Sequence, residues 1–326
     1  MAVGPFLWQI PASGRPFAGK VKSGKELRLP PRPSEYAQVA YDRVAGDYDD
    51  LWTPQTQTLN ARLTRELRLE RGEDLADLAC GTGVYTVEMG GVVRPGRVVG
   101  VDWSEGMLAE ARDRAHARGL DFEWVHAKAE DFVGSAPAGS FDVVSLRFCM
   151  AYVDWRHVLP RLGRLLRPGG RVGLLNSLSV SLPQLAQLYN KFRKSPEPAW
   201  KLFKHTRLSV PETWRIYRRL REAFGEPTFV KVPESTDEIA GLLARGGLAA
   251  EHAWTETTRM WFSSGAGAVD WMIDSGCSTD GELERLDERA KEFLILLFSA
   301  GMESFRERRG VPLDIVAGGV IARRPL

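Results

Sequence analysis

A short acidic and glycine-rich turn, together with an acid that follows it, has the residue types and spacing best suited to chemistry. Residues 77–83 read Asp-Leu-Ala-Cys-Gly-Thr-Gly after a short apolar run, and a segment with a helical pattern follows. A second apolar run, 97–101, ends at Asp102. Small residues let the backbone approach a ligand, and an acid after the next strand can accept two ribose hydroxyls. This spacing predicts a strand–helix–strand unit that binds a nucleoside.

Two classes of ligand use such a unit. In dinucleotide-binding proteins the pattern G-x-G-x-x-G/A places a pyrophosphate at the helix N-terminus. Here Thr86 stands where that pattern has its third glycine or alanine, and Asp77 precedes the turn. A carboxylate suits a ligand with an ammonium group better than a pyrophosphate. We therefore favour S-adenosylmethionine, which carries an adenosine, an ammonium group and a sulfonium, and which leaves as S-adenosylhomocysteine.

Apolar runs alternate with helical patterns through most of the chain. This alternation predicts an α/β fold with a Rossmann-like, doubly wound, mostly parallel sheet. One helix is expected from Ser34 and another to about residue 69, separated by the segment 45–52, and a tight turn is expected at 167–170. The strands are expected at 74–79, 97–102, 121–126, 141–146, 171–176, 250–261 and 315–325. The remaining helices are expected at 83–90, 105–118, 155–166, 235–246, 265–275 and 281–308.

The chain divides into an extension, a core and an insertion. Residues 1–34 are rich in Gly, Pro and Lys and have little periodicity, which predicts an irregular extension. Segments 35–180 and 233–326 form the expected core, with further helices inserted before the last strand. Residues 181–232 are aromatic and basic, and we expect a helical lid over an acceptor pocket. The basic residues have two open interpretations, a solvated helix face or a surface for an anionic or carrier-bound acceptor.

Motifs in register make residues 35–176 resemble the class I S-adenosylmethionine-dependent methyltransferases, in particular the small-molecule branch similar to the ubiquinone/menaquinone methyltransferases. The resemblance implies methyl transfer to O, N or C of a small aromatic or apolar metabolite, and a sheet with an antiparallel last strand. The matching segments are 41–49 (the lid helix), 77–83, 101–108, 127–132, 141–144 and 165–170.

The same resemblance implies roles for individual residues. Asp77 and the backbone of the turn would hold the methionine end, Asp102 the ribose, and two apolar side chains would flank the adenine. Arg147 would line the methionine and acceptor side, and two tyrosines would close over the cofactor. The full cofactor set is Tyr41, Tyr48, Asp77, Ala79, Gly81, Gly83, Asp102, Trp103, Met107, Ala129, Glu130 and Arg147.

The chain departs from the family pattern at three places. Ala79 replaces the first glycine of the turn, which we expect to be tolerated if its φ is negative. Residues 150–154 read Met-Ala-Tyr-Val-Asp where this branch commonly has His-His, and Lys128 replaces an Asp. These departures leave the cofactor interpretation intact. They put in doubt whether the family's catalytic residues have counterparts in this chain.

A general base is needed if the acceptor is a hydroxyl, a protonated amine or an acidic carbon, and no single motif supplies one. We rank Tyr152 and His205 first by expected position, ahead of His157 and His252. Each histidine also has a surface or structural interpretation. Cys80 is expected to be a small turn residue rather than a nucleophile.

Composition narrows the remaining classes. The 326 residues include 44% hydrophobic and 26% charged residues, an ordinary balance, with a net charge of +2. Three separated cysteines predict neither structural disulfides nor a metal site, and a cytoplasmic location is the simplest expectation. No apolar run is long enough for a membrane span, and no signal peptide is recognised.

Three function classes remain open from the sequence. A small-molecule methyltransferase, for which a homodimer is one possible assembly, is the first. A nucleic-acid or protein methyltransferase is the second, but the Pro-Pro-Tyr/Phe type of catalytic motif is absent after the fourth strand. A non-methylating enzyme or scaffold that keeps the cofactor on the same fold is the third.

Overall fold

A seven-stranded sheet organises the computed structural model, which describes residues 33–178, 183–184, 187–188, 232–275 and 288–326. The strand order is β3-β2-β1-β4-β5-β7-β6. The strands β1 to β5 pair in parallel, whereas β7 runs antiparallel to both of its neighbours. The predicted doubly wound sheet with an antiparallel last strand is therefore confirmed. The strands are β1 Leu75–Leu78, β2 Val98–Asp102, β3 Glu123–His126, β4 Phe141–Arg147, β5 Leu166–Ser177, β6 Ala249–Phe262 and β7 Val311–Arg323.

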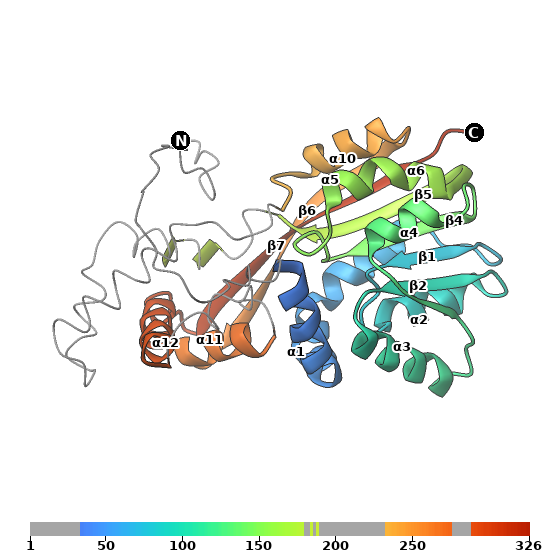
Figure 1. Ribbon diagram of the computed structural model, residues 1–326. Helices are drawn as coiled ribbons and strands as arrows, with labels where there is room; N and C mark the ends of the chain where they lie inside the picture. Colours follow the sequence, from blue (N-terminus) through green and yellow to red (C-terminus); the bar gives the residue numbers. More distant parts are fainter. Residues whose placement is uncertain (1–32, 179–182, 185–186, 189–231, 276–287) are drawn as a thin grey trace, which may run out of the picture.

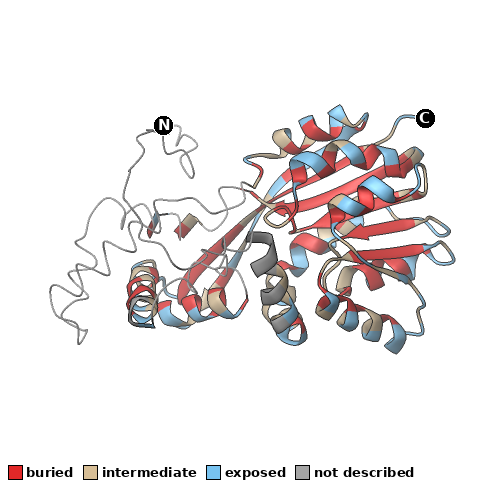
Figure 2. Ribbon diagram, viewed as in Figure 1, coloured by how far each residue is buried: buried red, intermediate tan, exposed pale blue. Residues whose placement is uncertain are grey.

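Helices cover both faces of the sheet (Figure 1). On one face lie α1 (Pro33–Leu67), α2 (Val84–Val93) and α3 (Glu105–Ala117). The other face carries α4 (Ala129–Ser135), α5 (Trp155–Val158), the short 3-10 helix η1 (Leu159–Arg161), α6 (Leu162–Leu165) and α10 (Thr236–Arg245). Because both faces are covered, β1 and β4 are buried along nearly their whole length, as is typical of parallel strands (Figure 2).

The antiparallel pair β6–β7 extends past the parallel strands and joins a second, smaller core. There α11 (Gly265–Asp274) packs against α12 (Glu288–Glu303), and we call these two helices with the adjoining ends of β6 and β7 the α11–α12 unit. Its core is apolar and buried, with Met272, Phe293 and Leu313 among its members. Leu51 and Trp52 of α1 pack against this core, so α1 bridges the main sheet and the α11–α12 unit.

Several local predictions were wrong. The segment 45–52 was expected to separate two helices, but α1 is one helix of 35 residues with Pro54 inside it. Asp49 and Trp52 each contact another part of the chain, and such tertiary contacts override weak local preferences. The expected helix at 155–166 is divided at η1, where Pro160 occupies the start of the 3-10 turn.

Two further differences concern short elements. The helix α4 was missed because seven residues, including Gly134 and Ser135, give no helical repeat to recognise. The expected turn at 167–170 lies within the bounds of β5, where Gly169 has a φ of 78° and the pairing with β4 shifts in register. The N-terminal extension and nearly all of the expected lid at 181–232 lie outside the described residues.

Candidate functional site

The turn between β1 and α2 is folded tightly at the carboxyl ends of the parallel strands. The Cys80 N–H donates to the Val101 carbonyl at 3.0 Å, and the Gly83 N–H donates to the Cys80 carbonyl at 3.1 Å. Gly81 and Gly83 have φ values of 56° and 72°, a region that glycine enters at little cost. The two glycines predicted for the turn therefore occupy conformations that require them.

Ala79 is a correction to the sequence-based expectation. Its φ is 54°, not negative, so this alanine occupies the left-handed region. A Cβ in that region costs roughly 1–2 kcal/mol. The family's glycine at this position would avoid that cost, so the replacement by alanine strains the backbone of the turn.

Gly83 also shows why the turn needs residues without side chains. A Cβ added there would stand 2.7 Å from the Ala111 Cβ of α3. Nothing lies within 4 Å of a Cβ added at Gly81, although its φ is positive. The turn is thus packed against α3 at Gly83 and has space beside Gly81, which fits close approach of a ligand.

Asp102 holds the turn from the end of β2. One carboxylate oxygen accepts the Gly81 N–H at 2.8 Å, and the other accepts the Ser104 N–H at 2.9 Å. Burial raises the pKa of Asp102, while these two N–H groups act in the opposite direction. Each carboxylate oxygen retains a further lone pair, so the group can still accept hydroxyls of a ribose.

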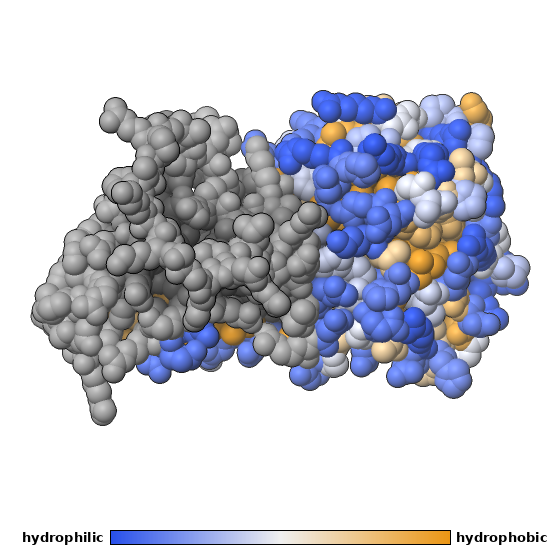
Figure 3. Space-filling model, viewed as in Figure 1, coloured by the Kyte–Doolittle hydropathy of each residue, from blue (hydrophilic) through white to orange (hydrophobic). Residues whose placement is uncertain are grey.

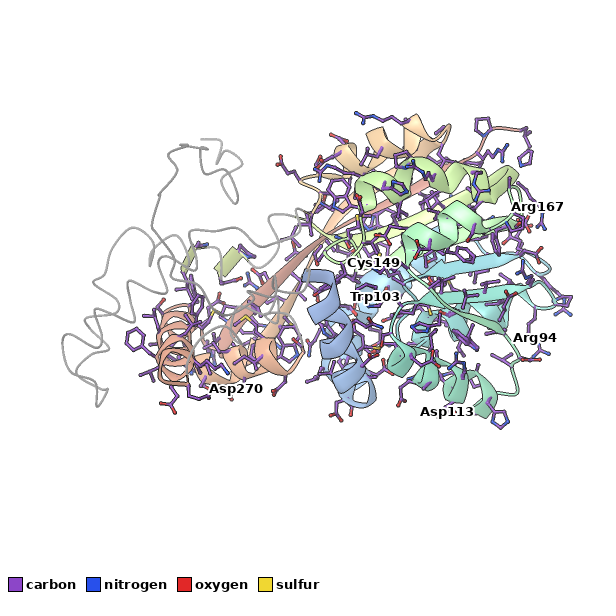
Figure 4. All side chains as sticks on the ribbon, viewed as in Figure 1. Arg94, Trp103, Asp113, Cys149, Arg167 and Asp270 are labelled. Carbon is purple, nitrogen blue, oxygen red and sulfur yellow. The ribbon has the colours of Figure 1, made fainter. Side chains whose placement is uncertain are left out.

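Trp103 follows Asp102 and is fixed by three elements. Its carbonyl accepts Gln38 Nε2 of α1 at 3.0 Å and lies 2.8 Å from His126 Nε2. The Lys128 ammonium stands 4.6 Å from the centroid of the Trp103 ring, which makes a cation–π contact. Figure 4 places Trp103 and Cys149 near the same end of the strands, opposite Arg94 and Arg167. Lys128, which replaces the family's Asp, therefore contacts the Trp103 ring that we expect to flank the adenine.

The other residues expected around the adenine come from α3 and α4. Met107 is 2% exposed and Ala129 5% exposed. Glu130 Oε1 accepts the Asp154 N–H at 2.5 Å, so this carboxylate also joins α4 to the loop after β4. Trp103 follows β2 directly, and the other three lie in the first turns of the helices that follow β2 and β3.

Asp77 and Arg147 belong to a buried polar network on the α1–α2 face of the sheet. Thr86 donates to Asp77 Oδ2 at 2.6 Å, and Asp77 pairs in register with Ser145 of β4. Arg147 Nε donates to Ser145 Oγ at 3.2 Å. Burial raises the pKa of Asp77 and lowers that of Arg147, and each charge opposes the shift of the other.

Among the described residues, the close contacts of the Arg147 guanidinium are with neutral groups, while the Asp77 and Glu88 charges act on it from farther away. Its remaining contacts are to neutral groups of α1 and α2, with Asn60 oxygens and Thr64 Oγ1 at 3.4 Å and Met89 Sδ at 2.9 Å. Among the described residues no acid lies within 4.0 Å of it. A buried guanidinium of this kind favours an anionic group nearby.

Three tyrosines meet, and the Asp102 charge acts on one of them, Tyr48. Tyr41 packs edge-on against Tyr152 at 5.1 Å and against Tyr48 at 5.9 Å between ring centroids. Burial raises the pKa of Tyr48 well above its usual range, and the neighbouring Tyr152 and Asp102 raise it further. The predicted tyrosines of α1 and of the loop after β4 are therefore brought together.

Of the histidines considered as bases, His157 and His252 are not brought to this cluster. His205 lies outside the described residues. His157 is exposed at α5, and His252 lies on the edge strand β6, 3.3 Å from Glu66 Oε2. Three strands separate β6 from β1. Burial raises the pKa of Cys149 to about 12 and that of Cys80 well above its ordinary value, so neither thiol is activated.

Sequence reasoning missed two carboxylates of α1. Asp42 accepts the Ser104 hydroxyl and the Gly106 N–H at the start of α3. Asp49 accepts the Thr82 hydroxyl of the turn at 2.6 Å and pairs with Arg114 of α3. The two acids are seven residues apart and so share one helix face. That spacing, repeated in Tyr41 and Tyr48, is the signal that could have found them.

The sheet order, the glycine turn and the acid at the end of β2 define a nucleoside-binding α/β protein of the S-adenosylmethionine type. The methyltransferase domain family matches residues 75–170. The chain is 25% identical to the demethylmenaquinone methyltransferase of Listeria monocytogenes serotype 4b (strain CLIP80459) over 231 residues, 67% of this chain and 94% of the relative. It is 32% identical to the enzyme of that name from Lactococcus lactis subsp. lactis (strain IL1403) over 180 residues, 50% of this chain and 67% of the relative.

Solved structures agree with the fold. A crystal structure described as a methyltransferase from Bacillus halodurans C-125 superposes with a TM-score of 0.52 at 17% identity, covering 82% of this chain and 99% of that one. The [4+2]-cyclase SpnF superposes with a TM-score of 0.51 at 14% identity, covering 91% and 98%. The fold alone therefore does not decide the reaction, and the sequence relatives carry the assignment.

The chain belongs to the class I S-adenosylmethionine-dependent methyltransferases, in the small-molecule branch that includes the demethylmenaquinone methyltransferases. It is a methyltransferase that uses S-adenosylmethionine and acts on small molecules. No helix among the described residues is long and apolar enough to cross a membrane. The face of the sheet-bearing part seen in Figure 3 is mostly hydrophilic, with small hydrophobic areas.

Proposed function

We propose that the chain methylates an oxygen, nitrogen or carbon of a small aromatic or apolar metabolite held between α1 and the loop after β4. The contact between Tyr41 and Tyr152 carries this proposal. Their rings meet edge-on, at 89° between planes, and they come from α1, which contacts the turn through Asp49, and from the loop after β4. With Tyr48 they offer flat apolar faces, and such faces suit a planar acceptor.

The cofactor contacts expected from the sequence are part of the proposal. Asp102 would accept the ribose hydroxyls, the backbone at Ala79, Gly81 and Gly83 would surround the methionine end, and Trp103 would flank the adenine. S-adenosylmethionine supplies a methyl group on a sulfonium, so its carbon is already activated. The protein then has to align the acceptor and exclude water.

Two side chains support an acceptor that reacts after losing a proton. Among the described residues, Tyr152 is the candidate for the general base. It follows β4, and its ring contacts Tyr41 at the edge of the tyrosine cluster. Arg147 is a buried cation whose hydrogen-bond partners are neutral oxygens and the Met89 sulfur. A phenolate, enolate or carboxylate of the acceptor, or the carboxylate of the cofactor, would place a further negative charge near this cation, in addition to that of Asp77.

The named relatives indicate which acceptor to try first. Their name, demethylmenaquinone methyltransferase, describes an apolar aromatic substrate, which agrees with the tyrosine cluster. We extend the proposal to a quinol-like acceptor, with phenols and apolar acids as alternatives. A cytoplasmic location and a homodimer are also proposed, to be checked by cell fractionation and sedimentation.

Label transfer tests the proposed function directly. The purified chain is incubated with methyl-labelled S-adenosylmethionine and either demethylmenaquinol or a metabolite extract. We expect label in an apolar product, and slower labelling with Asp102→Ala. Intact cofactor binding without transfer to any small molecule would overturn the proposal and favour a non-methylating role. Label in RNA or protein alone would favour a macromolecular substrate.

A further inference from the structure

Residues 49–52 of α1 make hydrogen bonds to two parts of the molecule that are distant in sequence. On one side, Asp49 Oδ1 accepts the Thr82 hydroxyl of the cofactor turn at 2.6 Å. Arg114 of α3 binds both partners, because it pairs with the Asp49 carboxylate and donates to the Thr82 carbonyl at 3.0 Å. Asp49, Thr82 and Arg114 thus form one closed group of contacts around the middle of the turn.

The next residues of the same helix are bound to α11. The Trp271 indole N–H donates to the Leu51 carbonyl at 3.1 Å, and the Trp52 indole N–H donates to the Ser275 carbonyl at 2.8 Å. The two indole rings meet at 5.0 Å between centroids, with 63° between their planes. These contacts join α1 to the α11–α12 unit through two directional bonds and one ring contact.

Burial makes the contacts of Thr82, Trp271 and Ser275 costly to break. Thr82 is 3% exposed, Trp271 8% and Ser275 0%. A buried donor or acceptor that loses its partner is left unsatisfied, which costs more than the net gain from an ordinary hydrogen bond. Asp49 and Leu51 lie within one turn of a helix, so they move together unless the helix itself opens.

We propose that Asp49 and Arg114 are positioning residues that fix the cofactor turn to α1, and that Trp271 and Trp52 pass this constraint to the α11–α12 unit. Filling the cofactor site would then order α11, and order in α11 would favour cofactor binding, because coupling between sites is reciprocal. This inference rests on the proposed location of the cofactor at the turn. It extends that proposal by naming the residues that connect the turn to a second unit.

A purely structural role for these residues makes a different prediction. If α1 only packs on its neighbours, removing one contact lowers stability and leaves the two regions independent. A spatial chain of contacts does not by itself establish coupling, so the test must detect a response in one region to a ligand in the other. Amide hydrogen exchange gives such a response without an acceptor.

The experiment measures exchange in the full-length chain with and without saturating S-adenosylhomocysteine. In the wild type we expect slower exchange at 79–84 and, by about fivefold or more, at 265–274, which is the lower end of typical coupling between sites. Asp49→Asn and Arg114→Lys should retain protection at 79–84 and lose most of it at 265–274. Trp271→Phe keeps an aromatic six-membered ring and removes the indole N–H together with the five-membered ring, so it should have the same effect.

Asp50→Asn is the matched control, because Asp50 is the next residue, is exposed and undergoes the same change of charge. It should behave as the wild type. Each variant is brought to saturation according to its own affinity, and a thermal melt establishes that it is folded. If Trp271→Phe does not fold, Trp52→Phe tests the same connection.

The outcomes separate the two proposals. Absence of protection at 79–84 in the wild type would contradict the proposed cofactor site. Protection there with no change at 265–274, or equal protection of 265–274 in Asp49→Asn and in the wild type, would overturn the coupling and leave the cofactor site standing.

Discussion

The Asp102 carboxylate accepts the Gly81 backbone N–H at 2.8 Å, so the acid at the end of β2 holds the turn at the end of β1. Asp102 thereby has two roles, because the group expected to bind a ribose also shapes the turn expected to surround the methionine end. The parallel pairing of β1 with β2 brings the two residues to the same edge of the sheet. Loss of this carboxylate should therefore affect both halves of the cofactor site.

Gly83→Ala should destabilise the fold more than a glycine replacement that only strains the backbone. At Gly83 a φ of 72° and an atom 2.7 Å from the new Cβ act together. Left-handed backbone costs roughly 1–2 kcal/mol, and overpacking adds about 1–3 kcal/mol.

Gly119→Ala is the control for that measurement. Gly119 has a φ of 63°, but nothing lies within 4 Å of the added Cβ. Urea unfolding of both variants should give a larger loss of unfolding free energy for Gly83→Ala. Equal losses would contradict the packing of the turn against α3.

Tyr152→Phe should lower kcat with little effect on affinity for S-adenosylhomocysteine. Phenylalanine keeps the ring that contacts Tyr41 and removes only the hydroxyl. A general base contributes typically about 10²–10⁴-fold. The measurement uses the acceptor found by label transfer.

Tyr41→Phe gives the comparison for Tyr152, since Tyr41 is assigned to the cofactor side of the same pair. It should change cofactor affinity more than kcat. An unchanged kcat in Tyr152→Phe would contradict the assignment of Tyr152 as the general base.

The Asp314 carboxylate should make the stability of the α11–α12 unit depend on pH. Its hydrogen bonds with Arg259, at 2.6 and 2.8 Å, hold the pKa of Asp314 below its usual range, against the effect of burial. Because the pKa of Asp314 is lower in the folded state, its carboxylate stabilises the fold at pH values above the pKa of an unfolded Asp, which is near 4. This stabilisation is lost as the pH falls through the pKa of the folded state.

Asp314→Asn should therefore destabilise the chain by roughly 1–3 kcal/mol at neutral pH. The difference from wild type should shrink below about pH 4. Thermal unfolding between neutral and acidic pH measures it. Glu288→Gln, an exposed acid on α12, serves as the control and should show little difference. A difference for Asp314→Asn that is independent of pH would contradict the ion pair.

The strand-end residues could be predicted because they depend on local pattern and on the parallel arrangement. Asp77 and Asp102 end apolar runs, and parallel strands bring such ends to one edge. Tyr152 follows β4 and reaches the same edge for the same reason. The fold class followed from the alternation of strands and helices, and the relatives confirm the family.

Other features depend on contacts that no local pattern records. Asp49 looks like one more acid in a polar segment until α3 supplies Arg114 and the turn supplies Thr82. The continuity of α1 through Pro54 depends on tertiary packing in the same way. The left-handed conformation of Ala79 is set by the tight turn around it, whereas the residue type alone favours a negative φ.

Calorimetric titration of S-adenosylhomocysteine into the wild type and Asp102→Ala tests the central claim most directly. Hydrogen bonds to a charged group contribute about 1.5–3 kcal/mol each, and 1.4 kcal/mol corresponds to a tenfold change in Kd. Loss of the ribose contacts should therefore weaken binding by at least about tenfold, while Asp113→Asn, an exposed acid on α3, leaves it unchanged. Unchanged affinity in folded Asp102→Ala would contradict the assignment of the turn and Asp102 as the cofactor site.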